Sequence, residues 1–324
     1  MPDTTAAPAP RPAEAAVESP RWPRGIRCAV VVSVDFDAEL PLLAADPTTA
    51  QRVKTLSVGR YGATRGVDRL LAEFQSQGVT TTWCVPGRNA ERYPHLIRAI
   101  AGHGHEIAHH GHAHEDFSRL GLAGQLEVAD RGSEAIADVT GERPRGFRIP
   151  AGEWAAGFPD ALADRGFTWS SSLHGDDLPH FHPARTAGPR VGTGTGRGTA
   201  RRLIEIPVHH ELHDHPYFFF NLDPAFPVGQ SRIASYREVL GNWTTEFDAY
   251  RRFGLCYTLR LQPEVTGTPG RIGIVRELLR HIRSHDDVWI ATAGEVADWW
   301  RSRNTGNAPG HPADVFDRCT RELA

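Results

Sequence analysis

The stretch HEIAHHGHAHED, residues 105–116, places five histidines within twelve positions and ends in two acids. His110 and His114 are four residues apart, and two imidazoles at that spacing in a turn or short helix can bind one metal ion. A surface cluster of histidines that binds no metal would have the same composition. A purification tag is not indicated, because the run is internal and is interrupted by Gly111 and Ala113. The spacing favours a metal site.

A pair of acids stands in SVDFDAE, residues 33–39, directly after an apolar run. The period-two spacing of Asp35 and Asp37 lets both side chains lean toward the same side of the chain. Two carboxylates so placed repel each other unless a cation lies between them or one of them holds a proton. The alternative is an ordinary pair of acids that caps a loop. Combined with the histidines, the pair would supply one Asp and two His to a metal and leave a second Asp as a base.

This set of ligands does not name a reaction by itself, since two His and one carboxylate also bind iron in non-haem oxygenases. The spare carboxylate favours hydrolysis, because a hydrolase needs a base beside the water that a metal activates. An oxygenase would need a site for a co-substrate, and the sequence indicates none. The pattern predicts metal-assisted hydrolysis, with Zn²⁺ as the expected ion.

The elements that must position these residues alternate along the chain as strand and helix. The predicted strands are 28–34, 78–85, 105–109, 145–149, 167–172, 203–208, 255–261 and 287–292. Apolar residues at i, i+3 and i+4 spacing predict helices over 67–77, 93–104, 122–141, 235–253, 271–285 and 295–303. Repeated strand and helix predict an α/β fold, a distorted barrel of seven or eight parallel strands wrapped by helices. Chemistry gathers at the carboxyl ends of such strands, where Asp35, Asp37 and the histidines stand.

Composition excludes some partners and limits the organisation of the 324 residues. Lys and Arg number 36 against 39 Asp and Glu, which gives no basic surface for nucleic acid or for an anionic membrane. Residues 1–24 are rich in Ala and Pro and are expected to form a disordered leader, followed by one domain over 25–303 and a tail over 304–324. The four cysteines form no C-x-x-C pair, and three stand in apolar runs, which favours reduced thiols and a cytoplasmic protein.

These motifs together resemble the polysaccharide deacetylase family, which has the NodB-homology fold. The resemblance covers about residues 25–300 and is greatest to an intracellular branch with peptidoglycan deacetylase-like, allantoinase-like and cyclic imide hydrolase-like members. It implies that Asp35 is the catalytic base, that Asp37, His110 and His114 bind the metal, and that Arg148 braces the base. Further matching stretches are SVGRYGATRGVDRLL (57–71), WCVPG (83–87), GFRIPAGEW (146–154), SSSLHGDDLPH (170–180), IEIPVHHELHDHPYF (204–218) and QPEVTGTPGR (262–271).

The sequence departs from the family on the penultimate strand, where most members carry a histidine that acts as general acid toward the leaving nitrogen. Here LRLQPEV places Gln262 at that position. An amide cannot donate a proton at neutral pH, although it can hydrogen-bond to the leaving group or orient water. The residues that could replace the acid are His174, His209, His210 and Glu264.

The sequence therefore predicts a metal-dependent hydrolase of a non-peptide C–N bond that removes an N-acyl group from an amino sugar or related small molecule. Ring opening of a cyclic imide or ureide is the alternative, because such a nitrogen leaves more easily and needs an acid less. A non-catalytic metal-binding relative is the alternative from another class, because Gln262 replaces the acid. A metal-independent allantoinase-like enzyme is not favoured, since the ligand set is complete. A homo-oligomer is expected, as in relatives of this branch.

Overall fold

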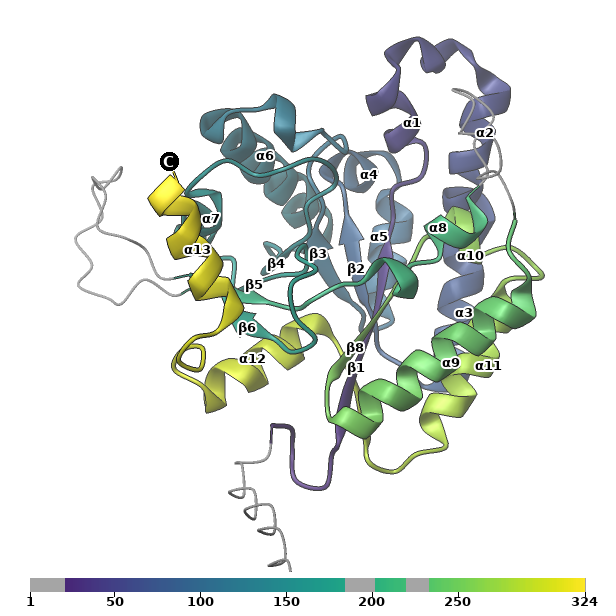
Figure 1. The fold of residues 1–324 in the computed structure, drawn as a ribbon. Coiled ribbons are helices and arrows are strands. Elements are labelled where there is room, and N and C mark those ends of the chain that lie inside the picture. Colours follow the sequence, from purple (N-terminus) through teal and green to yellow (C-terminus); the bar gives the residue numbers. More distant parts are fainter. Residues whose placement is uncertain (1–20, 184–201, 220–232, 324) are drawn as a thin grey trace, which may run out of the picture.

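The computed structural model describes residues 21–183, 202–219 and 233–323, which form a curled sheet wrapped by helices (Figure 1). The strands are short and mostly apolar, as expected where both faces of a sheet are covered. The strands of the described residues are β1 Cys28–Asp35, β2 Thr82–Val85, β3 Glu106–His109, β4 Gly146–Phe147, β5 Trp169–Ser170, β6 His180–Phe181, β7 Ile204–Glu205, β8 Cys256–Leu261 and β9 Val288–Ala291.

The strand order confirms the predicted fold. The order along the sheet is β6-β7-β5-β4-β3-β2-β1-β8, and β9 also pairs with β1. Every described pairing is parallel except that of β6 with β7. Each of the eight predicted strands overlaps an observed one, whereas β6 lies in a polar stretch without an apolar run and is not predicted. Between the segment after β7 and β8 the described residues supply a single bridge, His213 to Arg260, so the barrel is nearly open there.

Strand β1 shows how the apolar sequence leads into the site. Its eight residues are all buried, and alternate side chains enter two different hydrophobic clusters. Cys28, Val30, Val32 and Val34 pack with the cluster that includes side chains of helices α3 (Val67–Gln77), α9 (Tyr236–Phe253) and α11 (Ile272–Arg283). Ala29 and Val31 belong to the other cluster, and by the period of two Ser33 and Asp35 continue their face. That face therefore changes from apolar to polar at the carboxyl end of the strand.

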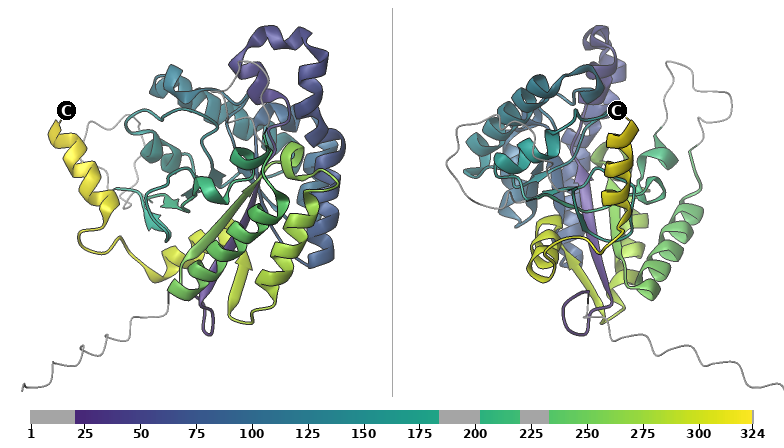
Figure 2. Two further views of the ribbon diagram at one scale, coloured as in Figure 1. Left: turned by 45° about the vertical axis from the view of Figure 1, so that its right-hand side comes forward. Right: turned by 60° about the vertical axis from the view of Figure 1, so that its left-hand side comes forward.

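The helices surround the sheet, and α9 and α11 lie side by side along one flank (Figures 1 and 2). All six predicted helical segments are found. Helix α12 begins with a reciprocal capping box between Thr292 and Glu295, which ties it directly to the end of β9. The remaining helices of the described residues are α1 Leu40–Ala45, α2 Val53–Tyr61, α4 Gly87–Arg92, α5 Pro94–Gly102, α6 Leu122–Thr140, α7 Phe158–Asp164, α8 His215–Phe218, α10 Pro263–Thr266, α12 Ala293–Arg303 and α13 Pro312–Leu323, with a π-helical turn, η2, over Gly62–Gly66.

The ends of the predicted domain are tied to its body. Trp22, within the expected leader, is buried, and its ring lies 5.8 Å from that of Trp300. Helix α13 occupies much of the expected tail, and Asn307 ahead of it exchanges two hydrogen bonds with the backbone of Phe181. The remainder of the leader, residues 1–20, lies outside the described residues. No helix of the part of the chain described here is long and apolar enough to span a membrane.

Candidate metal centre and active site

Asp35 ends β1 and is completely buried, yet both of its carboxylate oxygens are ion-paired. Oδ1 accepts a hydrogen bond of 2.7 Å from Nη1 of Arg148, and Oδ2 accepts one from Nε of Arg260. Burial by itself would raise the pKa of Asp35, but the two guanidiniums outweigh it and hold the pKa well below its usual range. Asp35 is therefore ionised at neutral pH and has no free oxygen among its described contacts.

Arg148 follows β4, and several hydrogen bonds fix its side chain next to Asp35. It is buried, its Nε and Nη2 donate to the backbone oxygen and hydroxyl of Ser171 at 2.8 and 2.7 Å, and its Nη1 also donates to Ser33 Oγ at 3.0 Å. Ser33 and Ser171 belong to β1 and to the segment after β5, so the side chain spans the inside of the barrel. Its place beside Asp35 is the one that the resemblance implies.

His110 and His114 lie in the loop that follows β3. The loop turns sharply, with positive φ at Gly111 (72°) and at His114 (60°), and Glu115 accepts hydrogen bonds from the backbone N–H groups of residues 112 and 113. A positive φ is uncommon for a residue with a side chain and is frequent at functional sites. The turn brings the two imidazoles to a centroid distance of 5.4 Å with their planes nearly perpendicular.

Asp37 completes a cluster whose atoms fit a cation. Its Oδ1 lies 3.4 Å from His110 Nε2, its Oδ2 lies 3.8 Å from His114 Nε2, and the candidate ligand atoms of the three residues all lie within 4.8 Å of one another. Asp37 Oδ1 and His110 Nε2 are buried and make no hydrogen bond within the described structure. His110 Nδ1 pairs at 2.9 Å with the backbone oxygen of Arg148, which leaves the Nε2 lone pair for a metal. Burial also lowers the pKa of His110, so the ring is neutral as a ligand must be.

Gln262 lies beside this cluster, immediately after β8. Its Nε2 donates to Asp37 Oδ2 at 2.7 Å, and its backbone N–H donates to Asp214 Oδ2 at 2.8 Å. The side-chain amide is thus engaged with the proposed metal ligand. Among the residues proposed to replace the acid, Glu264 lines the same cavity as Asp37, and its Oε2 is buried without a partner in the described structure.

Two cavities that share lining residues lie in this region, and the cluster opens into one of them. The first has a volume of about 190 Å³ and is lined by Asp37, His114, Gln262 and Glu264 among others. The second, of about 360 Å³, is lined by residues that include Arg148, Trp154, His174 and His210. Pro150 and Arg260 line both cavities. His209 lines neither, and its Nε2 lies 3.2 Å from Asp177 Oδ1.

Three residues of this region are not predicted from the sequence: Arg260, His213 and Asp214. Arg260 stands within CYTLRL, and a charged residue in so apolar a strand is the signal that could have found it. His213 lines the first cavity, and its buried Nε2 has no hydrogen bond among the described residues. Burial raises the pKa of Asp214 to about 7, and no pattern in the sequence indicates this.

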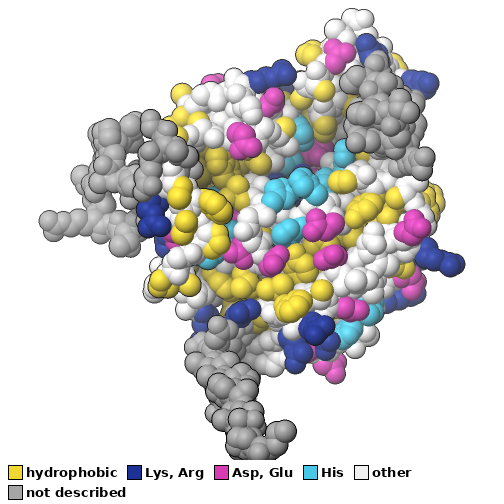
Figure 3. All heavy atoms as spheres, in the orientation of Figure 1, with side chains coloured by type: hydrophobic (Ala, Val, Ile, Leu, Met, Phe, Trp, Pro, Cys, Tyr) yellow, Lys and Arg dark blue, Asp and Glu magenta, His cyan; other side chains and the backbone are white. Residues whose placement is uncertain are grey.

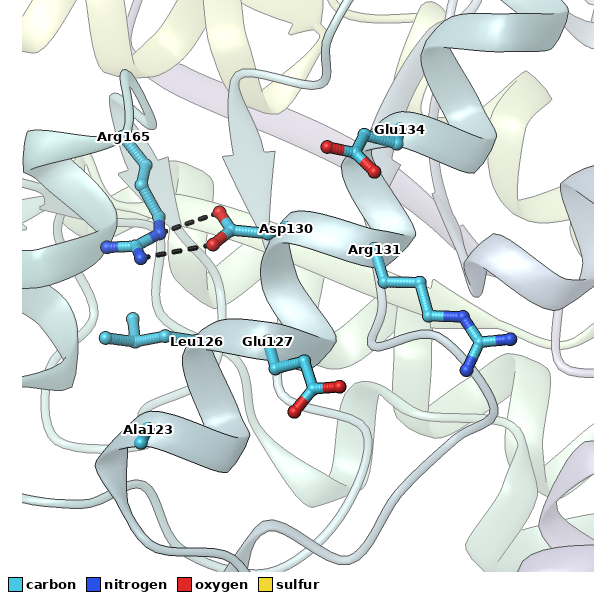
Figure 4. Close-up of a pocket in the computed structure, with 7 residues that line it drawn as sticks. All are labelled: Ala123, Leu126, Glu127, Asp130, Arg131, Glu134 and Arg165. Atoms are coloured by element: carbon cyan, nitrogen blue, oxygen red, sulfur yellow. Dashed lines mark hydrogen bonds and ion pairs between the residues drawn. The ribbon is translucent and has the colours of Figure 1, made fainter.

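Histidines also gather in the middle of one face of the molecule (Figure 3). A separate hollow of about 490 Å³ lies on the outside of α6, where Arg165 pairs with Asp130 at 2.7 and 3.1 Å (Figure 4). Both members of that pair are partly exposed, with 32% and 45% of their side chains accessible to solvent. The hollow brings together no buried polar atoms that lack partners, so the cluster at the strand ends is the better candidate for a site.

Solved structures identify the family. The crystal structure of a Mycobacterium smegmatis protein assigned as a polysaccharide deacetylase superimposes with a TM-score of 0.79 and 35% sequence identity, over 90% of this chain and 96% of that one. The chain belongs to the polysaccharide deacetylase family. Residues 59–170 match the family model described as polysaccharide deacetylase. The deacetylases and the allantoinase among its relatives and structural neighbours are hydrolases that act on non-peptide C–N bonds, and this chain is a hydrolase of that class.

Other relatives agree with this assignment. The peptidoglycan deacetylase of Helicobacter pylori is 26% identical over 77% of this chain and 88% of its own length. The allantoinase Puue superimposes with a TM-score of 0.72 at 20% identity, over 93% of this chain and all of that one. At that identity the allantoinase shares the fold, and it gives no information about the substrate of this polysaccharide deacetylase homologue.

Proposed function

We propose that the chain is a divalent-metal-dependent deacylase that removes an N-acyl group from an amino sugar or a related small molecule. The observation that carries the proposal is the contrast between two neighbouring aspartates. Asp35 has both oxygens in ion pairs, whereas Asp37 keeps a buried, unpaired oxygen next to the unpaired Nε2 of His110. One acid is thus held ionised by two arginines, and the other keeps an oxygen that can bind a cation.

Asp37, His110 and His114 would hold the cation, and Zn²⁺ suits two imidazoles and a carboxylate. A bound cation supplies Lewis-acid chemistry, which polarises a carbonyl and makes water more acidic. Asp35 accepts the proton from the attacking water. Its low pKa makes it a weak base.

The leaving nitrogen must gain a proton, and Glu264 is the residue proposed to donate it. Burial and the nearby charge of Asp37 raise the pKa of Glu264 well above its usual range, which favours the protonated form of this carboxyl. Its buried, unpaired Oε2 lines the cavity that also contains Asp37 and His114. The amide of Gln262 donates a hydrogen bond to Asp37 and so positions the Asp37 carboxylate. Proton transfer is then the role of Glu264.

A small substrate suits the size of the site, because the two neighbouring cavities measure about 190 and 360 Å³. The cytoplasmic location and the homo-oligomeric state expected from the sequence stay predictions.

Ring opening of a cyclic imide or ureide is the second candidate reaction. It is favoured by the commitment of the Gln262 amide to Asp37, which leaves no strong acid at the position where the family usually carries histidine. The nitrogen of an imide or ureide leaves as an anion stabilised by a second carbonyl, so it needs less help from an acid.

The experiment that tests the proposal measures metal content per chain and hydrolysis of N-acetylated amino sugars and cyclic imides. It compares the wild type with His110→Ala and with the exposed control His103→Ala. We expect one metal ion fewer per chain in His110→Ala, together with loss of hydrolysis, and no change in the control. The difference between variants is decisive, because two other described clusters could also bind metal: Asp176 with His180 and His311, and Asp248 with His281 and His285.

Two results would contradict the proposal. Equal metal content in wild type and His110→Ala would refute the ligand assignment. Metal that is lost in the variant, with no hydrolysis of any compound by the wild type, would instead identify a non-catalytic metal-binding relative. Hydrolysis of imides alone would favour the second candidate reaction.

A further inference from the structure

Arg260 is a charged residue near the carboxyl end of an apolar strand, and part of its guanidinium has no hydrogen-bond partner among the described residues. Its neighbours in β8, Leu259 and Leu261, are fully buried, whereas 19% of the Arg260 side chain is exposed to solvent. Its Nε donates to Asp35, and the described structure contains no hydrogen bond from its Nη1 or Nη2. A guanidinium carries five N–H donors in a fixed fork, so the two terminal nitrogens can bind a planar acceptor.

The position of Arg260 relates it to the substrate as well as to Asp35. It lines both the cavity that contains the candidate metal ligands and the larger cavity that contains Trp154 and His174. A molecule whose scissile bond lies in the first cavity and whose remainder extends into the second would pass directly over this side chain. Arg260 therefore lies where it can contact a part of the substrate that does not react.

The charges around the larger cavity favour an anion. Arg148 already pairs with Asp35, so the charge of Arg260 is in excess of what that carboxylate needs. Burial and a neighbouring imidazole lower the pKa of His174, which is therefore neutral at neutral pH. The carboxylate of Glu153, the remaining charged group that lines this cavity, belongs to an exposed residue whose charge water screens.

We infer that the substrate carries a carboxylate next to its N-acyl or imide group, and that the terminal nitrogens of Arg260 bind this carboxylate from the larger cavity. The inference rests on the proposed function and names its substrate class. N-acyl amino acids, acidic N-acyl amino sugars and carboxylate-bearing cyclic imides belong to this class. Neutral amino sugars do not.

The test compares each carboxylate substrate with its own methyl ester, which removes the charge and adds a single methyl group. The proteins are the wild type, Arg260→Gln, Arg260→Lys and the surface control Arg165→Gln. We expect the wild type to prefer the carboxylate, and we expect this preference in kcat/KM to fall roughly 10- to 100-fold in Arg260→Gln, mainly through KM, as one charge-assisted pair is lost. Arg260→Lys should keep part of the preference, and Arg165→Gln all of it.

The ratio of the two substrates is the readout, because any loss of Asp35 function in the variants affects both substrates alike. An unchanged ratio in Arg260→Gln would refute the inference and leave the hydrolase intact. If no compound is hydrolysed by the wild type, the proposed function fails. The inference is then tested by calorimetric binding of succinate to metal-loaded protein, which should be weaker in Arg260→Gln; equal binding or no binding by the wild type would refute it.

Discussion

Replacing Arg148 by Met would break the most deeply buried ion pair of the site while keeping most of the side-chain volume. Arg148 is 2% exposed and donates four hydrogen bonds of 2.7–3.0 Å, to Asp35, to Ser33 and twice to Ser171. In the variant, Arg260 is the remaining ion-pair partner of Asp35 among the described residues, and Ser33 and Ser171 lose the hydrogen bonds that Arg148 donates. Removing one partner of a buried pair costs about 3–5 kcal/mol, because the remaining charge is buried and poorly compensated.

The matched control is Arg165→Met, which breaks the partly exposed pair with Asp130 on the outside of α6 (Figure 4). Pairs of this kind contribute about 0–1 kcal/mol, since water and salt screen both charges. The assay is urea unfolding followed by tryptophan fluorescence, for which the chain offers eight tryptophans. We expect the loss in unfolding free energy to be several-fold larger for Arg148→Met than for the control.

The pH dependence supplies a second check on Arg148→Met. In the wild type the pKa of Asp35 is depressed, so this carboxylate stabilises the fold above the unfolded pKa of about 4, and the contribution disappears only as the pH falls through the folded-state value. Loss of Arg148 raises the folded-state pKa, so the deficit of the variant should shrink as the pH falls through that raised value. A loss below about 1 kcal/mol, equal to that of Arg165→Met, would refute the view that buried charge compensation holds this site together.

Two further variants test the acids near Gln262. Glu264→Gln should slow the hydrolysis of N-acetyl amines by roughly 100-fold or more and that of cyclic imides much less, because it removes a proton donor that poor leaving groups need; equal losses for both substrate classes would contradict its role. Burial raises the folded-state pKa of Asp214 to about 7, so the stability that its protonated form contributes is present below about pH 4 and is lost as the pH rises through 7. Asp214→Asn should therefore remove up to about 4 kcal/mol of pH dependence between pH 4 and 7, measured as the difference from wild type in urea unfolding; parallel curves for the two proteins would show that Asp214 does not titrate in this range.

The hydrophobic pattern predicts the fold because most strands are continuous apolar runs, and polar residues follow each run directly in the sequence. In β1 the alternation of apolar side chains positions Asp35, and the loop after β3 brings His110 and His114 to the same end of the barrel. These relations follow from periodicity and from the parallel order of strands. β6 escapes prediction because it lies in the polar stretch HGDDLPHFHP, which has no apolar run, and it is held by its antiparallel neighbour.

Arg260 escapes prediction for a different reason. The partner of its Nε, Asp35, is 225 positions away in sequence, and the spacing along β8 gives no sign of the contact. The two cavities that Arg260 lines are also formed by loops from several strands, whose conformations depend on packing that a single sequence does not specify. Electrostatic contacts between residues far apart in the sequence are thus the part of this site that only the structure shows.

The period-two pair of aspartates shows most clearly what the structure contributes to the chemistry. From the sequence, Asp35 and Asp37 are equivalent candidates for ligand and base, and only the family resemblance separates their roles. In the structure, Arg148 and Arg260 pair with both oxygens of Asp35, so their positive charges compensate this carboxylate without a cation. Gln262 occupies one oxygen of Asp37, and the other remains unpaired beside His110. The same two arginines also weaken Asp35 as a base, so its proposed function depends on the cation that Asp37 would hold.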